Sequence, residues 1–258
     1  MLNAQFTPST KTKSDFFVFG AGHLQKIAES YKGNYNSAKP YPHAVIDDFL
    51  PKEVAEHLLS LFPGPDAPSW FDHKTRNPAH QPGKQGIGNA EKLEGVNPFI
   101  HNIMFAFNSY PFIRFLEILT GITHLLPDPH LHGGGLHQIL PGGKLQVHAD
   151  FNFHAGLQLY RRLNVLLYLN KDWKEEYGGA FEMWEKDMSA CSKKLFPIFN
   201  RMVVFNTHKT SFHGHPEPLA CPPGMTRKSV AFYYYTKDYV EDDLEHHSTL
   251  WQRRPGEE

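Results

Sequence analysis

RLNVLLYL, residues 162–169, is a strand-like segment, and its run NVLLYL (164–169) is apolar on both faces. A strand has this character where its sheet is covered on both sides, by a second sheet or by helices. Similar β-branched or aromatic segments surround it, separated by Gly, Pro and Asn turns. They are GGGLHQIL (133–140), KLQVHAD (144–150), GGAFEMW (178–184), RMVVF (201–205) and SVAFYYY (229–235). This series of short strands predicts a jelly-roll barrel.

The part of the chain before this series has mainly helical patterns. HAVIDDFL (43–50) is typical of a strand that enters a helix, and Pro51 suits the first helical position. Asn97 and Pro98 are typical of a helix cap and first residue, and Pro111 begins another predicted helix that ends near Gly121. We therefore expect an α+β fold with a mainly β core: a double-stranded β-helix (cupin-like jelly-roll) buttressed by N-terminal helices.

The same patterns suggest a division of the chain. Residues 1–40 are expected to form an N-terminal extension, and residues 41–240 one domain. Within that domain, residues 41–128 would supply helical support and residues 129–240 the jelly-roll core. Residues 241–258 form a charged tail.

Composition limits the classes of function. Hydrophobic residues make up 40% and aromatics 14%, which argues against global disorder, and a formal net charge of -1 gives no general attraction to nucleic acid. Cys191 and Cys221 are too widely spaced for a CxxC motif, which fits a reducing compartment. The early FFVFGAG segment is too short for a signal or membrane segment. We expect a cytoplasmic protein with no nucleic-acid or membrane partner; the oligomeric state stays open.

Histidine is abundant, with 17 residues, so about one H-x-D pair is expected by chance. His148 and Asp150 in KLQVHAD form such a pair, and residues two apart on a strand both face the same side, here the barrel interior. SFHGHP (211–216) offers a second histidine, His213 or His215. Two imidazoles and one carboxylate suit iron(II) and leave a face open for a chelating co-substrate and oxygen.

Arg227 stands at the start of the strand SVAFYYY, shortly after these histidines. A guanidinium meets a carboxylate through two parallel charge-assisted hydrogen bonds, and this pairing is strong inside a barrel. Ser229 lies on the alternating face of the same strand. The pattern indicates a site for the far carboxylate of a co-substrate.

The second half of the chain resembles the prolyl 4-hydroxylase-type iron(II)/2-oxoglutarate-dependent dioxygenases, which include the oxygen-sensing prolyl hydroxylases of animals. The likeness covers roughly residues 132–236. Its blocks are, in order, LPGG before VHAD, then YLNKDW, GGAFEMW, FNRMVVF, SFHGH and RKSVAFYYY. Upstream, residues 40–63 look like the opening of bacterial and microbial-eukaryote members related to ribosomal-protein prolyl hydroxylases.

The resemblance implies particular roles for residues of this chain. His148, Asp150 and His213 would be the iron ligands, which selects His213 over His215. Arg227 would bind the 5-carboxylate of 2-oxoglutarate, and Tyr168 would hydrogen-bond the same carboxylate.

The chain departs from the family's pattern before the PG turn. Many members have a tyrosine there that contacts the co-substrate, whereas this chain has Leu140. Gln138 or His137 is expected to supply the missing contact.

The resemblance also implies the reaction: hydroxylation of a C–H bond, with 2-oxoglutarate and O2 consumed, succinate and CO2 released, and ascorbate as a possible further cofactor. A prolyl residue in a protein or peptide is the expected substrate. The alternative is a small-molecule hydroxylase acting on an amino acid, sugar or natural product. A non-catalytic cupin-like binding protein is disfavoured, because a pure binder needs neither an open iron face nor a carboxylate clamp.

The segment 72–95 is polar and rich in Gly, Pro, Asn and Lys. Such a connection with little core is either a lid or a solvated surface loop. Arg76, His80 and Lys84 in this segment are the candidate substrate-binding residues.

Overall fold

The structure is a computed structural model that describes residues 16–72, 79–88, 90–238, 243 and 245–257. Residues 1–15 of the predicted N-terminal extension (1–40) lie outside the described residues. The helices are α1 (Ala21–Tyr35), α2 (Lys52–Leu61), α3 (Ala90–Glu94), α4 (Pro98–Phe107), α5 (Tyr110–Thr120) and the short 3-10 helix η2 (Glu175–Tyr177). The strands are β1 (His43–Ile46), β2 (Phe71–Asp72), β3 (Lys84–Ile87), β4 (Leu126–Pro127), β5 (Gly135–Ile139), β6 (Leu145–Ala149), β7 (Phe153–His154), β8 (Leu159–Tyr168), β9 (Phe181–Trp184), β10 (Cys191–Leu195), β11 (Met202–Asn206), β12 (His213–His215), β13 (Arg227–Thr236) and β14 (Leu250–Trp251).

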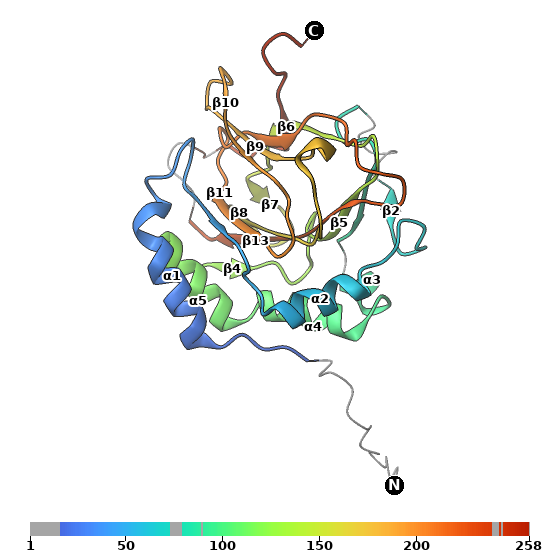
Figure 1. Cartoon of the computed structure of the whole chain (residues 1–258). Coiled ribbons are helices and arrows are strands. Elements are labelled where there is room, and N and C mark those ends of the chain that lie inside the picture. Colours follow the sequence, from blue (N-terminus) through green and yellow to red (C-terminus); the bar gives the residue numbers. More distant parts are fainter. Residues whose placement is uncertain (1–15, 73–78, 89, 239–242, 244, 258) are drawn as a thin grey trace, which may run out of the picture.

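The strands form two antiparallel sheets (Figure 1). The larger sheet has the order β1-β11-β8-β13-β5-β3-β2, with β4 beside β13 and β7 beside β8. The smaller sheet has the order β10-β9-β12-β6-β14. Most neighbours within a sheet are distant in the sequence, as in a jelly roll. The predicted double-stranded β-helix with N-terminal helices is confirmed.

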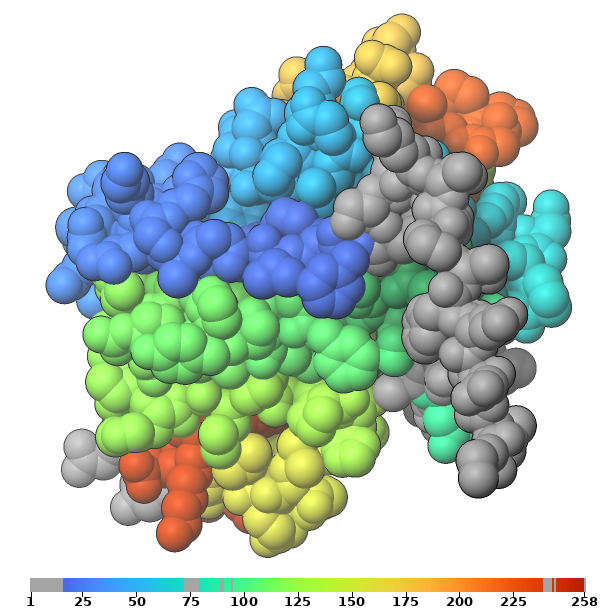
Figure 2. Space-filling model, turned by 90° about the horizontal axis from the view of Figure 1, so that it is seen from below, coloured from blue at the N-terminus to red at the C-terminus, as the bar shows by residue number. Residues whose placement is uncertain are grey.

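The helices cover one face of the larger sheet (Figure 1), and residues of α1, α4 and α5 form much of the surface in Figure 2. Helix α4 begins as predicted, because the Asn97 side chain accepts a hydrogen bond from the backbone N–H of Phe99. Helix α5 ends at Gly121, whose φ of 77° suits glycine. None of the helices in the described part of the chain is both long and apolar enough to cross a membrane.

Strand β13 separates the helical layer from the barrel interior. Its residues Val230, Phe232 and Tyr234 are buried in the main hydrophobic core. The ring of Phe232 stacks on Phe107 of α4 with centroids 4.3 Å apart, and the Tyr234 hydroxyl donates to the Phe107 carbonyl. Since side chains alternate along a strand, this packing turns the other residues of β13 towards the barrel interior.

The segment 72–95 contributes more to the core than its composition indicates. Strand β3 pairs with β5 and so extends the larger sheet, and Ile87 is fully buried. The close pairing requires Gly135, where an added Cβ would lie 2.1 Å from the Ile87 carbonyl oxygen. The expectation of a connection with little core is therefore wrong for residues 84–87. Glycine-rich strands lack the residue types by which strands are recognised.

The C-terminal segment packs on the barrel. Buried Asn152 donates to the Glu245 carbonyl at 2.8 Å and accepts from the His247 N–H at 2.9 Å. Strand β14 then pairs with β6, and Trp251 lies opposite His148. Strand β14 thus forms one edge of the smaller sheet.

Candidate active site

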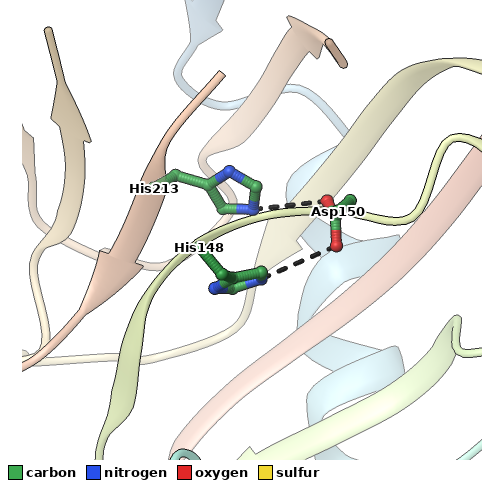
Figure 3. Close-up of side chains that lie close together, drawn as sticks. All are labelled: His148, Asp150 and His213. Carbon is green, nitrogen blue, oxygen red and sulfur yellow. Dashed lines mark ion pairs between the residues drawn. The ribbon is translucent and has the colours of Figure 1, made fainter. Parts of the chain in front are cut away.

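A cavity inside the barrel is lined by residues of both sheets. One end, here called the metal end, consists of His148, Asp150 and His213. His148 on β6 and His213 on β12 are direct partners in the strand register. Asp150 follows β6, with its Oδ1 3.6 Å from His148 Nε2 and its Oδ2 3.3 Å from His213 Nε2 (Figure 3). One ligand atom from each residue lies within 4.8 Å of the others.

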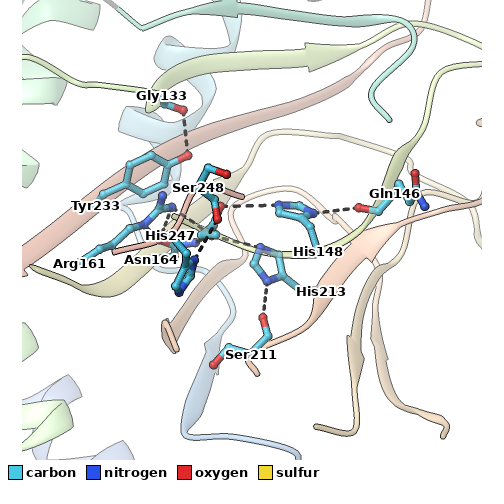
Figure 4. A network of polar contacts seen from close by, with 11 residues as sticks. Gly133, Gln146, His148, Arg161, Asn164, Ser211, His213, Tyr233, His247 and Ser248 are labelled. Atoms are coloured by element: carbon cyan, nitrogen blue, oxygen red, sulfur yellow. Dashed lines mark hydrogen bonds and ion pairs between the residues drawn. The ribbon is translucent and has the colours of Figure 1, made fainter. Parts of the chain in front are cut away.

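Backbone carbonyls orient the two imidazoles of the metal end. His148 Nδ1 lies 2.8 Å from the Gln146 carbonyl oxygen, and His213 Nδ1 lies 2.8 Å from the Ser211 carbonyl oxygen (Figure 4). A carbonyl only accepts, so each Nδ1 carries a proton, and each Nε2 is the ring nitrogen that lies near the Asp150 carboxylate. Burial lowers the pKa of His148, and the neighbouring His213 lowers it further. The His148 ring is therefore neutral, as a metal ligand must be.

Asp150 is held ionised by neighbours that sequence analysis did not single out. Asn164 donates to its Oδ2 at 2.7 Å, and Arg161 Nη2 lies 3.1 Å from the same atom. Burial alone would raise the pKa of this carboxyl group, but Arg161, His213 and His148 together hold it well below its usual range. An oriented carboxylate and two imidazoles, without a thiolate, form a donor set that suits iron(II).

Arg161 is itself fixed in place. Its Nε and Nη2 donate to Asn164 Oδ1 at 2.8 and 2.6 Å, and its guanidinium carbon lies 3.5 Å from the centroid of the Tyr233 ring. The Tyr233 hydroxyl donates to the Gly133 carbonyl at 2.8 Å (Figure 4). Aromatic stacking and the ion pair with Asp150 together compensate for the burial of this charge.

The other end of the cavity, here called the arginine end, consists of Arg227, Tyr168, Lys84 and His215. Arg227 is 5% exposed; its Nε donates to the Gly179 carbonyl at 2.7 Å, and its Nη2 lies 3.4 Å from the Tyr168 hydroxyl. Gly179 has a φ of +68°, and an added Cβ would lie 3.0 Å from Arg227 Cδ. The second glycine of GGAFEMW therefore makes room for the arginine.

The structure brings most of the predicted site residues to this cavity. His148, Asp150, His213, Arg227, Tyr168 and Ser229 all line it, and so does His137. Gln138 points to the opposite face of β5, where it donates to Gln85 Oε1 at 2.6 Å and accepts from Thr226 Oγ1 at 2.9 Å. The prediction that Gln138 binds the co-substrate is therefore wrong. Of the two residues expected to compensate for Leu140, His137 faces the cavity.

The three candidate substrate-binding residues are placed differently. Lys84 lines the cavity. His80 stacks on Trp251 with ring centroids 4.4 Å apart, and Trp251 in turn lies 4.9 Å from the His148 ring. Arg76 lies outside the described residues.

The missed residue Asn164 had a signal in the sequence. Asn164, Leu166 and Tyr168 alternate along β8 and all line the cavity. A polar residue inside the apolar run NVLLYL, in phase with Tyr168, indicates the cavity-facing side of the strand. The pairing of Arg161 with Asp150 has no such local signal.

Comparisons with known proteins agree with this geometry. Residues 134–235 match the profile of the 2OG-Fe(II) oxygenase superfamily. The chain matches no curated protein sequence. Among solved structures it is similar to a prolyl hydroxylase from Trichoplax adhaerens in complex with a peptide of the hypoxia inducible factor oxygen degradation domain, with 14% identity, a TM-score of 0.56, and coverage of 84% of this chain and 92% of that chain.

A second similar structure comes from the prolyl 4-hydroxylases of Phytophthora capsici, with 17% identity, a TM-score of 0.54, and coverage of 89% of this chain and 69% of that chain. At these identities the structural likeness shows a shared fold. The profile match and the predicted series of sequence blocks cover the same residues. Residues 134–235 are thus similar to the 2OG-Fe(II) oxygenase superfamily, and this part of the chain contains His148, Asp150, His213 and Arg227.

Proposed function

We propose that this protein hydroxylates a C–H bond of a prolyl residue in a protein or peptide, with iron(II), 2-oxoglutarate and O2. One observation carries the proposal: the His148, Asp150 and His213 cluster and the buried Arg227 lie at two ends of the same cavity. A superfamily profile match supports the chemistry. A prolyl substrate is supported by the shared fold with prolyl hydroxylases, one of them in complex with a peptide.

In this proposal each end of the cavity has a separate task. His148 and His213 would bind iron(II) through Nε2, and Asp150 through a carboxylate oxygen. Arg227, Tyr168 and Ser229 would bind the 5-carboxylate of 2-oxoglutarate. When bound, iron(II) and 2-oxoglutarate supply the oxidant for hydroxylation, and succinate and CO2 are the co-products. Burial raises the pKa of Tyr168 although Arg227 opposes the shift, so its hydroxyl stays protonated and donates to a carboxylate.

The surroundings of the metal end would protect the reaction from bulk water. Trp251 lies across the ring of His148, and Asn152 fixes the segment that leads to it. Exclusion of water strengthens the electrostatic contacts in the cavity and limits side reactions. Cys191 and Cys221 are both free, which supports the further proposal that the protein works in a reducing compartment such as the cytosol.

The test is a search for a product that has gained one oxygen. The protein is incubated with iron(II), 2-oxoglutarate and ascorbate as reductant, and proline-containing peptides, free amino acids and sugar nucleotides are screened by mass spectrometry while succinate is measured. We expect a hydroxylated peptide and coupled succinate release. His148→Ala should abolish both, whereas His130→Ala, at an exposed histidine, should retain both.

Other results would change the proposal in distinct ways. A hydroxylated free amino acid or sugar would identify a small-molecule oxygenase. Binding of metal and 2-oxoglutarate with no succinate from any substrate would contradict the enzymatic function and favour a cupin-like binding protein.

A further inference from the structure

Lys84 places a second cation in the cavity beside Arg227. It stands at the start of β3 and lines the cavity wall. Its ammonium makes no hydrogen bond or ion pair with any residue that the structure describes. Two backbone hydrogen bonds next to it fix its position: the Leu140 N–H donates to the Gly83 carbonyl at 2.9 Å, and the Lys144 N–H donates to the Pro82 carbonyl at 3.1 Å.

The strand register directs Lys84 towards Arg227. Lys84 is paired with Ile139 of β5, and Ile139 is paired with Arg227 of β13. Residues in one such row point to the same face of a sheet, and all three line the cavity. Two strand spacings separate the backbones by roughly 10 Å, a distance that two long basic side chains can bridge together with a ligand between them.

Within the described part of the chain, no acidic side chain pairs with this lysine. Among the described residues that line the cavity, Asp150 is the only acidic one, and it is already in contact with Arg161 and Asn164. Burial lowers the pKa of Lys84 to about 8; Arg161 and Arg227 act in the same direction, and Asp150 opposes them. An anion that enters the cavity would relieve the repulsion between the lysine and the arginines.

His215 adds a buried ring nitrogen without a partner to the same end. It is 3% exposed, lines the cavity, and its Nδ1 has no hydrogen-bond partner in the structure. The metal end is complete with His213, so His215 is not needed there. A buried ring nitrogen without a partner is costly unless a ligand completes its hydrogen bonding.

We propose that Lys84, assisted by His215, is a second contact for the far carboxylate of the co-substrate, so that this end selects a dicarboxylic 2-oxo acid over a monocarboxylic one. This inference rests on the proposed function. A carboxylate offers about four acceptor positions on its two oxygens, enough for Arg227, Tyr168 and Lys84 together. A 2-oxo acid that lacks the far carboxylate would leave both cations buried without a counter-charge, which disfavours its binding.

The test compares two ligands that differ only at the far end, 2-oxoglutarate and 2-oxopentanoate. Calorimetric titrations are made with the full chain loaded with Mn(II), so that no turnover occurs. Lys84→Met should weaken binding of 2-oxoglutarate by roughly ten-fold or more, because a charge-assisted contact is lost. Its affinity for 2-oxopentanoate should stay the same or rise, because that ligand offers Lys84 no counter-charge.

Two further variants complete the design. Lys84→Arg keeps the positive charge and should recover most of the affinity for 2-oxoglutarate. Lys186→Met removes an exposed lysine in the turn between β9 and β10 and should change neither affinity. Thermal melting of each variant verifies that the compared proteins are folded.

The outcomes separate this inference from the proposed function. Equal weakening of both ligands in Lys84→Met would place the lysine at the metal end and overturn the inference, and so would an unchanged affinity for 2-oxoglutarate. If the wild type prefers 2-oxoglutarate and Lys84→Met has the same ratio of the two affinities as the wild type, only the inference fails. If the Mn(II)-loaded wild type binds neither ligand, the proposed function fails and the inference with it.

Discussion

The two ends of the cavity differ in how far the protein alone completes them. At the metal end, both imidazoles have carbonyl partners at Nδ1, and the Asp150 carboxylate is in contact with Asn164 and Arg161. At the arginine end, Arg227 and Lys84 face the cavity with no acidic partner among the residues that the structure describes, and the buried Nδ1 of His215 has no hydrogen-bond partner there. The metal end is thus organised by the fold, whereas the arginine end reaches charge balance only with a bound anion.

The sheets explain this difference. His148 and His213 lie on adjacent strands of the smaller sheet, in direct register, so their rings are neighbours with centroids 4.5 Å apart. Most of the arginine end comes from three strands of the larger sheet, β3, β8 and β13. Adjacent strands hold His148 and His213 in a fixed cluster, whereas β5 separates β3 from β13, so the long side chains of Lys84 and Arg227 lie on either side of an open space.

The largest expected effect comes from breaking the metal end. His213→Ala should weaken Mn(II) or iron(II) binding by at least about 100-fold. Loss of a group that only orients a metal ligand lowers metal affinity by about 10- to 100-fold, and loss of the ligand itself should lower it by more. His215→Ala should keep metal affinity within a few-fold of the wild type. Metal binding is measured by calorimetry under anaerobic conditions.

His215→Ala is a matched control, because both histidines lie on β12, both are buried and both line the cavity. If His215→Ala lost the metal and His213→Ala kept it, the assignment of the ligand would be reversed. If both variants kept it, the cluster in Figure 3 would not be a metal centre.

Breaking the arginine end should have a different signature. Arg227→Ala should weaken 2-oxoglutarate binding by roughly 100-fold, because it leaves a buried carboxylate without its main partner, while metal affinity stays close to the wild type. Arg227→Lys keeps the charge but loses the paired geometry, so its affinity for 2-oxoglutarate should lie between those of the wild type and Arg227→Ala. Unchanged affinity for 2-oxoglutarate in Arg227→Ala would contradict the proposed division between the two ends.

Much of the metal end could be predicted because its signals are local. Residues two apart on a strand share a face, so His148 and Asp150 were expected together, and the resemblance to a known family selected His213 for the third position. By the same alternation, Gln138 and His137 cannot both face the cavity: His137 lines it, whereas Gln138 contacts Gln85 on the opposite face of β5. A choice between adjacent residues needs the register of the strand, and register is set by its partners.

The contacts that were missed depend on pairing between distant segments. Arg161 reaches Asp150 only because of how β8 lies beside the turn after β6. Lys84 is a candidate site residue by sequence, but its place beside Arg227 follows only from the pairing of β3 with β5. The composition of the glycine-rich residues around β3 is typical of a loop. The close approach of β3 to β5, which Gly135 permits, is apparent only from the structure. Tertiary pairing here overrides local propensity.

The smallest expected effect concerns stability at the arginine end and follows from Lys84. Burial, with Arg161 and Arg227, lowers its pKa from 10.5 to about 8 although Asp150 opposes the shift, so the charged lysine destabilises the folded state. This penalty is complete below pH 8 and disappears as the pH rises towards 10.5, where the unfolded chain also loses the proton. After solvent screening we expect about 1 kcal/mol, equivalent to roughly 2–4 °C in melting temperature.

Ligand-free Lys84→Met should therefore melt a few degrees higher than the wild type at pH 7, and the difference should shrink towards pH 10. Mn(II) with 2-oxoglutarate should reverse the order, because the wild type binds the co-substrate more tightly and gains more stability from it. Differential scanning calorimetry with and without these ligands measures both effects. A lower melting temperature for the ligand-free variant would mean that the lysine already has a stabilising partner, and the contrast between the two ends would then not hold.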